Sequence, residues 1–299
     1  MKVYHFSDLA QHGQTQQDGI SIGYNGVDIL GAHTLHGHDY YEMTYMCDGE
    51  GVQIINQKPY YVQKGSVIVL SPRDVHLHYP LTEFCPLTCC FVRTDPLGFL
   101  PPETAFPIVV HLDQRYQLQI EQLFFLLNEE LKNKMPYHSQ AAWHFLDSVF
   151  LVIQRNLRKD PTLLMWDNVL SYIVNSLKDV DFATAVQLYG CSSSHFCRMF
   201  KRDFSMTFTE FVTGMRIQRA KELLTNTSYS VSEIYEQCGY NSNQRFYFDF
   251  KKATGVTPTK YRKREQKTPQ SQTSSVPPPS DTLSIRQNMM VEQDLTSEF

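Results

Sequence analysis

The residues best able to do chemistry in this chain are three histidines and a glutamate between positions 36 and 76. His36, His38 and Glu42 follow the spacing His-x-His-x-x-x-Glu, and His76 comes further along the chain. In an extended strand, residues i and i+2 point to the same face, so the first two imidazoles would lie together. This donor set suits a divalent metal ion, which raises the hypothesis of a metalloenzyme. Alternatively, the same side chains line a pocket for a small molecule or have a structural role.

A second region with chemical character is strongly basic. Between residues 190 and 264 the sequence has 13 Lys and Arg against 6 Asp and Glu, a net charge of +7 in a chain whose total is −4. The remainder of the chain therefore carries −11. This asymmetry indicates one domain that faces an anion such as nucleic acid, although a basic solvated face would have the same composition.

The elements expected to position the histidines are short β-strands. Segments rich in β-branched and aromatic residues alternate with turn sequences such as Asp48-Gly49 and Lys64-Gly65. The segments are Val52–Asn56, Tyr60–Val62, Ser66–Leu70 and Leu87–Val92. Many short strands separated in this way predict an antiparallel barrel or sandwich over residues 20–110.

From Asp113 the apolar residues change to helical spacing. Two amphipathic runs, separated by Met135-Pro136 and ending near Asp160-Pro161, predict a helical hairpin. The hairpin would either pack against the β domain or form a dimer interface. Beyond Glu265 the chain is rich in Gln, Ser, Thr and Pro, so we expect a disordered tail.

The basic region contains an internal repeat at an offset of fifty residues. The matched pairs are Phe196 with Phe246, Phe200 with Phe250, Lys201 with Lys251, Arg202 with Lys252, Thr207 with Thr257 and Phe211 with Tyr261. Helix-capping residues precede each copy, namely Asp181 and Ser192 in the first, and Ser230 with Asn241 or Ser242 in the second. A helix, a Gly-containing turn and a second helix predict a helix-turn-helix unit that can enter the major groove of DNA.

These residues resemble the AraC family of bacterial transcription regulators. The resemblance runs from about Leu177 to Arg262, and its most specific stretches are Arg198-Met199-Phe200-Lys201, Met215-Arg216-Ile217, Ala220-Lys221-Glu222-Leu223-Leu224, Gly239-Tyr240 and Phe250 to Pro258. It implies that residues 182–264 bind DNA through two helix-turn-helix units joined by a longer helix. The positions that typically face bases correspond to Ser193, Ser194, Cys197 and Arg198 in the first recognition helix, and to Asn243, Gln244, Tyr247 and Phe248 in the second.

Side chains around these positions are expected to support DNA binding. His195 and Arg245 flank them, and Lys201, Arg202, Lys251 and Lys252 are candidates for phosphate contacts. Arg198 could bind guanine through two hydrogen bonds, and Gln244 could bind adenine in the same manner. The sequence departs from the family where Val186 and Tyr235 replace Ala, Ser205 replaces Gly, and Phe248 replaces a commonly basic residue. We therefore expect base specificity to lie mainly in the first unit.

The N-terminal motif resembles that of cupins. His36 to Glu42 with Gly49 resembles the first cupin motif, and Gly65 to Pro72 with His76 resembles the second, although Arg73-Asp74 and Pro80 depart from it. AraC-type regulators often carry a cupin-like domain that binds a small molecule without catalysis. We therefore expect His36, His38, Glu42 and His76 to line an effector pocket, with a sugar or another polyhydroxy ligand as the candidate effector. A metal site on the same four residues is the alternative, and no cofactor is predicted.

The predicted fold is α+β in two domains. An N-terminal antiparallel cupin-like β-barrel with a helical hairpin precedes an all-α domain with two helix-turn-helix units. The predicted divisions are residues 1–112 for effector sensing, 113–160 for the hairpin and dimerisation, 161–264 for DNA binding, and 265–299 for the tail. The predicted function is an effector-controlled transcription regulator and not an enzyme, with a cupin metalloenzyme as the alternative.

The expected partners follow from this function. They are double-stranded operator DNA, a small-molecule effector, a second copy of the chain and, as a further candidate, RNA polymerase. No apolar run is long enough to span a membrane, no apolar signal segment opens the chain, and the seven cysteines have no repeated Cys-x-x-Cys spacing. We therefore expect a cytoplasmic protein with reduced thiols, and the sequence leaves activation and repression open.

Overall fold

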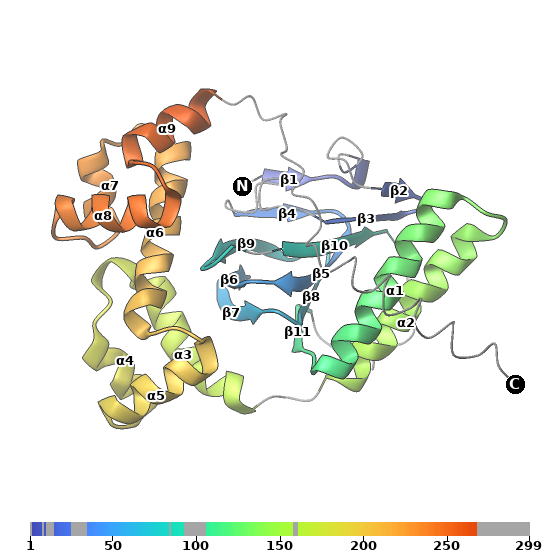
Figure 1. Cartoon of the computed structure of the whole chain (residues 1–299), viewed down its shortest axis with the longest axis horizontal. Helices are drawn as coiled ribbons and strands as arrows, with labels where there is room; N and C mark the ends of the chain where they lie inside the picture. The colour runs from blue at the N-terminus through green and yellow to red at the C-terminus, as the bar shows by residue number, and fades with distance from the viewer. Residues whose placement is uncertain are drawn as a thin grey trace, which may run out of the picture.

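The computed structural model describes residues 2–7, 9, 15–24, 35–83, 85–92, 106–157 and 161–267. Figure 1 shows a central group of strands with helices on two opposite sides. The strands are β1 (Lys2–Tyr4), β2 (Thr15–Gln17), β3 (Ile20–Tyr24), β4 (His36–His38), β5 (Tyr41–Asp48), β6 (Glu50–Ile55), β7 (Lys58–Gln63), β8 (Ser66–Leu70), β9 (Val75–Pro80), β10 (Cys85–Phe91) and β11 (Ile108–His111). The helices are α1 (Gln114–Asn133), α2 (His138–Arg155), α3 (Pro161–Asn175), the 3₁₀ turn η2 (Leu177–Asp179), α4 (Phe182–Tyr189), α5 (Ser193–Phe204), α6 (Phe208–Asn226), α7 (Val231–Gln237), α8 (Asn243–Thr254) and α9 (Pro258–Lys267).

The strands form two facing sheets. The smaller sheet has the order β1-β4-β9-β6-β7, and the larger has the order β11-β8-β5-β10-β3-β2. Neighbouring strands are antiparallel, except that β1 runs parallel to β4. The predicted cupin-like β domain is confirmed, but among the described residues its strands pair as two sheets and not as a closed ring.

The two faces of each sheet have different neighbours, as the alternation of side chains along a strand requires. In β5, Met43 and Tyr45 belong to the cluster beneath α1 and α2, whereas Met46 packs between the sheets with Ile55 and Val62. Because both outer faces are covered by helices, the strands are buried on both sides. This explains why a strand such as β8 is a nearly continuous apolar run with every residue buried.

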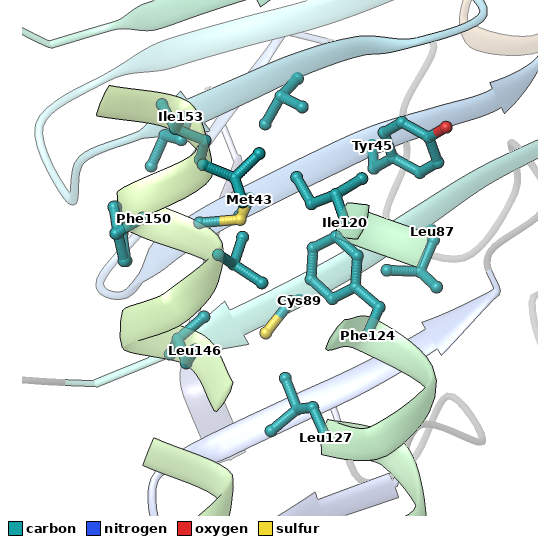
Figure 2. Packing of buried hydrophobic residues seen from close by; sticks show 14 of the residues in the cluster. Met43, Tyr45, Leu87, Cys89, Ile120, Phe124, Leu127, Leu146, Phe150 and Ile153 are labelled. Carbon is teal, nitrogen blue, oxygen red and sulfur yellow. The ribbon is translucent and has the colours of Figure 1, made fainter. Parts of the chain in front are cut away.

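The hairpin of α1 and α2 covers the outer face of the larger sheet. Asp113 accepts a hydrogen bond from the backbone N–H of Tyr116 and so caps α1 where the sequence predicted its start. Figure 2 shows the two helices directing apolar side chains onto strands β5 and β10, and the residues that meet are Met43, Tyr45, Leu87, Cys89, Ile120, Phe124, Leu127, Leu146, Phe150 and Ile153. The prediction that the hairpin packs against the β domain is therefore confirmed, and its dimerisation remains a prediction.

The C-terminal helices cover the outer face of the smaller sheet. One apolar cluster joins Val52, Ile54, Tyr61 and Tyr79 of β6, β7 and β9 to Trp166 and to residues of α4, α5 and α6. The two predicted domains therefore share a continuous buried contact. A large apolar contact of this kind restrains the domains against one another more than a polar surface would.

Several smaller expectations can be compared with the structure. The seven cysteines are free thiols in the structure. Helix α9 continues to Lys267, beyond the predicted end of the DNA-binding domain at Arg264. The rest of the predicted tail, residues 268–299, lies outside the described residues. Within the described part of the chain, every helix is too short or too polar to span a lipid bilayer.

Candidate functional sites

The first helix-turn-helix unit consists of α4 and α5. The Asp181 carboxylate accepts from the N–H of Thr184, and the Ser192 hydroxyl accepts from the N–H of His195, so both predicted caps are confirmed. Gly190 lies in the turn with φ of 78°, a conformation that glycine adopts without a steric cost. The side chains that α5 directs inward are Phe196, Phe200 and Phe204. Its opposite face is therefore directed outward.

The second unit consists of α7 and α8. Ser230 and Glu233 form the predicted capping box, and the Ser242 hydroxyl caps α8, which decides between Asn241 and Ser242. Gly239 in the turn has φ of 77°, and a Cβ at this position would collide with the backbone carbonyl oxygen of Lys178. The turn of the second unit therefore packs closely against the backbone of η2.

Most of the side chains predicted to face bases are accessible. On α5 the exposed ones are Ser193, Ser194, Cys197 and Arg198, and on α8 they are Asn243, Gln244 and Phe248. His195 and Tyr247 are partly buried. A guanidinium nitrogen of Arg198 lies 3.0 Å from Nδ1 of His195, so this pair can hold the Arg198 side chain in place on the helix.

The residues predicted to contact phosphates divide into two groups. Lys201, Lys251 and Lys252 are exposed on the C-terminal halves of their helices. Arg202 and Arg245, in contrast, are paired with carboxylates, because Arg202 lies 2.6 Å from Asp203 and Arg245 lies 2.8 Å from Asp249. The two guanidiniums are exposed, whereas Asp203 and Asp249 are only 12% and 6% exposed. A phosphate that took either guanidinium would therefore leave a largely buried carboxylate without this partner, which is costly.

Three of the four residues predicted for the N-terminal pocket meet between the two sheets. His38 on β4, Glu42 on β5 and His76 on β9 are buried, and their donor atoms all lie within 4.8 Å of one another. Nε2 of His38 lies 3.7 Å from Oε2 of Glu42. His36 lies outside this trio, although its ring centroid is 4.2 Å from that of its cross-strand partner His76.

Burial decides the protonation of these three residues. Loss of solvation lowers the pKa of His38, and the same loss together with the neighbouring histidines lowers the pKa of His76 well below its usual value. Burial also raises the pKa of Glu42, and the charge of His36 opposes this effect. Neutral imidazoles are therefore favoured, and a neutral imidazole offers a lone pair to an electrophile or a hydrogen-bond donor.

Backbone and side-chain partners orient the two rings from behind. Nδ1 of His38 lies 2.7 Å from the carbonyl oxygen of Tyr40, so this nitrogen carries the proton. Nε2 of Gln53 donates to Nδ1 of His76 over 2.8 Å. Among the described residues, Nε2 of His38 and Nε2 of His76 are buried and have no hydrogen-bond partner. Each such atom costs about 1–3 kcal/mol, so the trio is a site poised for an additional partner.

The sequence did not identify Gln53 or Tyr40 as parts of this site. Gln53 lies directly opposite His78 in the register of β6 and β9, which places its amide between His76 and His78. That register is not visible in the local sequence, and a single Gln in an apolar strand has no motif. Tyr40 contributes a backbone oxygen, for which no side-chain signal exists.

The sequence also missed a set of polar contacts between the β domain and the helical domain. Tyr61 of β7 donates from its hydroxyl to the carbonyl oxygen of Phe204, the last residue of α5, over 3.2 Å. Its ring also meets the Phe204 ring edge-on at 4.6 Å between centroids. The β domain thus supplies a partner to a carbonyl that the end of a helix leaves unsatisfied.

Strand β9 makes the other link. Tyr79 donates to the Glu222 carboxylate of α6 over 3.4 Å, and Gln218 of α6 donates to the carbonyl oxygen of Pro80 over 2.6 Å. Because side chains alternate along the strand, β9 presents His76 to the space between the sheets and Tyr79 to the helical domain. One strand therefore contributes to the histidine cluster and also contacts α6, the helix that joins the two helix-turn-helix units.

Comparison with known proteins finds a matching family model for each half of the chain. A family model of the AraC-like ligand binding domain matches residues 30–143, and a model of a helix-turn-helix domain matches residues 186–264. The HTH-type transcriptional activator RhaR of Mannheimia succiniciproducens is 26% identical over 246 residues, which cover 77% of this chain and 87% of that protein. RhaR of Escherichia coli strain K12 is 22% identical over 252 residues, which cover 79% of this chain and 88% of that protein.

Among solved structures, that of ToxT from Vibrio cholerae O395 aligns with 14% identity and a TM-score of 0.35, covering 77% of this chain and 91% of ToxT. The two family models describe the same two domains, in the same order, as the sequence analysis predicted. They describe regulators, so the alternative of a cupin metalloenzyme is set aside. This chain belongs to the AraC family of DNA-binding transcription regulators and consists of an AraC-like ligand-binding domain followed by a helix-turn-helix domain.

Proposed function

We propose that the chain is a transcription activator whose binding to operator DNA is controlled by a small molecule held in the β domain. The observation that carries this proposal is the pair of links from the β domain to α5 and α6, through Tyr61 and Tyr79. A ligand that favours one position of β7 or β9 shifts the helical domain between two arrangements. It does so by as much as its affinities for the two arrangements differ.

The DNA-binding mode follows from the position of α5 and α8. We place Ser193, Ser194, Cys197 and Arg198 against bases in one segment of the major groove, and Asn243, Gln244, Tyr247 and Phe248 in a second segment. Helix α6 joins the two units and has 19 residues. Its length of about 28 Å is comparable to one turn of DNA at about 34 Å, so the units reach neighbouring segments of the groove on one face of the duplex.

We further propose that the active form is a homodimer joined through α1. Three of its apolar side chains remain exposed after the hairpin has packed on the sheet: Leu118 at 55%, Phe125 at 50% and Leu126 at 43%. Leu118 and Phe125 are seven residues apart and share a helix face, as a helix-to-helix seam requires. Phe125→Glu is expected to yield a monomer in sedimentation experiments, and Gln119→Glu on the same helix serves as the control.

The proposed effector is a sugar or another polyhydroxy molecule bound near His36, His38, Glu42 and His76. Buried imidazoles and a carboxylate can form several hydrogen bonds with neighbouring hydroxyl groups. A protein that binds operator DNA acts where that DNA is, so we propose a cytoplasmic location. RNA polymerase is the partner through which an activator of this type would exert its effect.

The test of the proposed function begins with the operator. The full chain is used to select duplexes from a random pool, and a site with two short elements about one helical turn apart is expected. Candidate sugars are then screened by thermal unfolding, because a ligand that binds only the folded state raises the unfolding temperature. If the chain bound no duplex DNA even at low salt, the proposal would be contradicted, since nonspecific binding by this basic domain is strongest there.

A further inference from the structure

We propose that Cys47 and Cys85 form a reversible disulfide when the chain is exposed to a peroxide. The two residues lie at adjoining ends of neighbouring strands, since Cys47 is the last but one residue of β5 and Cys85 is the first residue of β10. Both are free thiols and partly exposed in the structure. This modification site is separate from the buried histidine cluster, and it does not depend on how operator binding is controlled.

The register of β5 and β10 brings the two side chains together. Tyr45 lies opposite Leu87, and both pack beneath the helical hairpin (Figure 2). Cys47 and Cys85 are each two residues further along, so the alternation of side chains directs them to the same face. A β-bulge lies at this point, and its two residues Cys47 and Asp48 oppose Cys85.

The spacing of such a pair is close to that of a disulfide. Residues that lie opposite one another in an antiparallel pair have Cβ atoms about 4.5–5.5 Å apart, and a disulfide holds them about 3.5–4.5 Å apart. A shift of about 1 Å would therefore join the two sulfur atoms. The bulge can accommodate this shift, because its additional residue is not held in the ladder of backbone hydrogen bonds.

The surroundings of the pair favour a thiolate on Cys85. A hydrogen bond from the Cys47 thiol lowers the pKa of Cys85 to about 7, although burial and the charge of Asp48 oppose this effect. The same hydrogen bond, together with burial and the charge of Glu121, raises the pKa of Cys47. The carbonyl oxygen of Tyr45 is a second acceptor for the Cys47 thiol, at the long distance of 4.0 Å. Because the thiolate is the nucleophile, Cys85 is the thiol that attacks first.

The oxidation proceeds in two steps. The Cys85 thiolate attacks one oxygen of hydrogen peroxide, the O–O bond breaks, and Cys85 becomes a sulfenic acid while hydroxide leaves and takes up a proton as water. The Cys47 sulfur then attacks the sulfenic sulfur, and the hydroxyl group leaves as water with the proton of Cys47. Two thiols and one peroxide thus give one disulfide and two waters, with two electrons passing to the peroxide. A thiol reductant reverses the reaction by exchange.

The other cysteines differ from this pair in accessibility or in their place in the fold. Cys89, Cys90 and Cys238 are buried, and burial raises the pKa of each thiol. Such thiols are protected from oxidants in water. Cys191 is partly exposed, as Cys47 and Cys85 are, but it lies in the turn between α4 and α5. It is therefore the matched control for a thiol of similar exposure.

The disulfide would restrain a segment that contacts the helical domain. This segment connects β9 to β10, and the N–H groups of its residues Leu81 and Thr82 both donate to the carbonyl oxygen of Glu50. A Cβ on Gly214 of α6 would lie only 2.8 Å from Cδ2 of Leu81, so α6 packs closely on the same segment. A bond from β5 to the start of β10 would tether both ends of this connection. We therefore expect amide hydrogen exchange at Leu81 and Thr82 to slow on oxidation.

The experiment uses the full chain, reduced and then exposed to one equivalent of hydrogen peroxide. Remaining thiols are alkylated, and linked peptides are identified by mass spectrometry without reduction. We expect a monomer that has lost two hydrogen atoms, with Cys47 joined to Cys85, and we expect dithiothreitol to restore the thiols. Cys47→Ser and Cys85→Ser should lose the link, and Cys191→Ser should keep it.

Trapping of sulfenic acid with dimedone tests the order of the two thiols. In Cys47→Ser the hydroxyl can still donate to Cys85, so label should accumulate at Cys85. Label should form more slowly at Cys85 in Cys47→Ala, which lacks the donor, and at Cys47 in Cys85→Ser. Circular dichroism checks that each variant is folded, and the unaltered chain decides where a variant is not.

Several results would overturn the proposal. They are an unaltered chain that forms no link between Cys47 and Cys85, a link that joins two chains, or faster labelling of Cys47 in Cys85→Ser than of Cys85 in Cys47→Ser. Unchanged hydrogen exchange at Leu81 and Thr82 after oxidation would contradict the expected restraint. Operator binding by the reduced chain, measured in parallel, keeps these results separate from the proposed function.

Discussion

The two helix-turn-helix units have the same framework and differ in what they expose. Their recognition helices match at an offset of fifty residues, with Phe196 and Phe200 of α5 corresponding to Phe246 and Phe250 of α8, all fully buried. The exposed residues of the two recognition helices, in contrast, differ at the same offset. Arg198 of the first unit corresponds to Phe248 of the second, whose side chain is 62% exposed. A guanidinium can distinguish guanine from other bases, whereas a phenyl ring makes only apolar contacts.

The units also differ in their attachment. The core of the first unit is continuous with the smaller sheet through Tyr61, Tyr79 and Trp166. The core of the second unit is a separate cluster of residues from α6 to α9. Figure 1 shows α7 and α8 beside α6 and away from the strands. The first unit, which carries Arg198, is therefore also the unit whose core is continuous with the ligand-binding domain.

The largest expected effect is the loss of stability when a buried ring is removed from either of the two cores. Phe200→Ala and Phe250→Ala each remove a fully buried ring, which should cost about 3–5 kcal/mol of stability. Hydrogen exchange of the full chain should rise in α3, α5 and β7 for Phe200→Ala. For Phe250→Ala it should rise only in the segments from α6 to α9. Faster exchange in β7 of Phe250→Ala would show that the two cores are not separate.

The next effect concerns DNA. Arg198→Ala should weaken operator binding by about 1–3 kcal/mol and relax base preference at one position, because a contact with two hydrogen bonds to one base is lost. Phe248→Ala at the matching position should change affinity by less than about 0.5 kcal/mol. Both are measured by titrating the selected operator. Equal losses would remove the proposed asymmetry.

A smaller effect tests the attachment of the first unit. Tyr61→Phe removes the hydroxyl that donates to the carbonyl oxygen of Phe204, so the free energy of unfolding should fall by about 0.5–1.5 kcal/mol. Hydrogen exchange should increase at the end of α5. The control is Tyr229→Phe, at an exposed position between the units, which should leave both quantities unchanged. An unaltered end of α5 in Tyr61→Phe would argue against this link.

The smallest expected effect on stability comes from backbone strain at the ends of the two recognition helices. Ser205 and Gly255 end α5 and α8 at matching positions and both are left-handed, with φ of 53° and 73°. Gly255→Ala introduces strain where no atom lies within 4 Å of the new Cβ, so it should lower stability by about 1 kcal/mol. Ser205→Gly relieves the same strain and should raise stability by about 0.5 kcal/mol, measured by urea unfolding. A stabilising Gly255→Ala would contradict the explanation.

The sequence predicted the helical half of the molecule in detail because its signals are local. Asp181, Ser192 and Ser230 all cap helices as predicted, and each needs only a backbone N–H three residues away. The strained end at Ser205 was also expected, from the absence of the usual glycine.

The β half was predicted less completely because its contacts depend on register and on pairing between distant segments. The sequence grouped His36 with His38, Glu42 and His76, but the packing of the two sheets selects three of the four. Gln53 enters the site only through the alignment of β6 with β9. The hydrogen bonds of Tyr61 and Tyr79 could not be predicted for the same reason, since their partners lie in a different domain.

The most direct test of the central claim is a complete set of single base-pair substitutions in the selected operator, titrated with the full chain. Arg198→Ala and Gln244→Ala identify which part of each half-site lies under α5 and which lies under α8. The account predicts that the largest losses, about 1–3 kcal/mol per base pair, fall under α5 and that the loss at one position disappears in Arg198→Ala. Larger losses under α8, or the same pattern in Arg198→Ala, would contradict it.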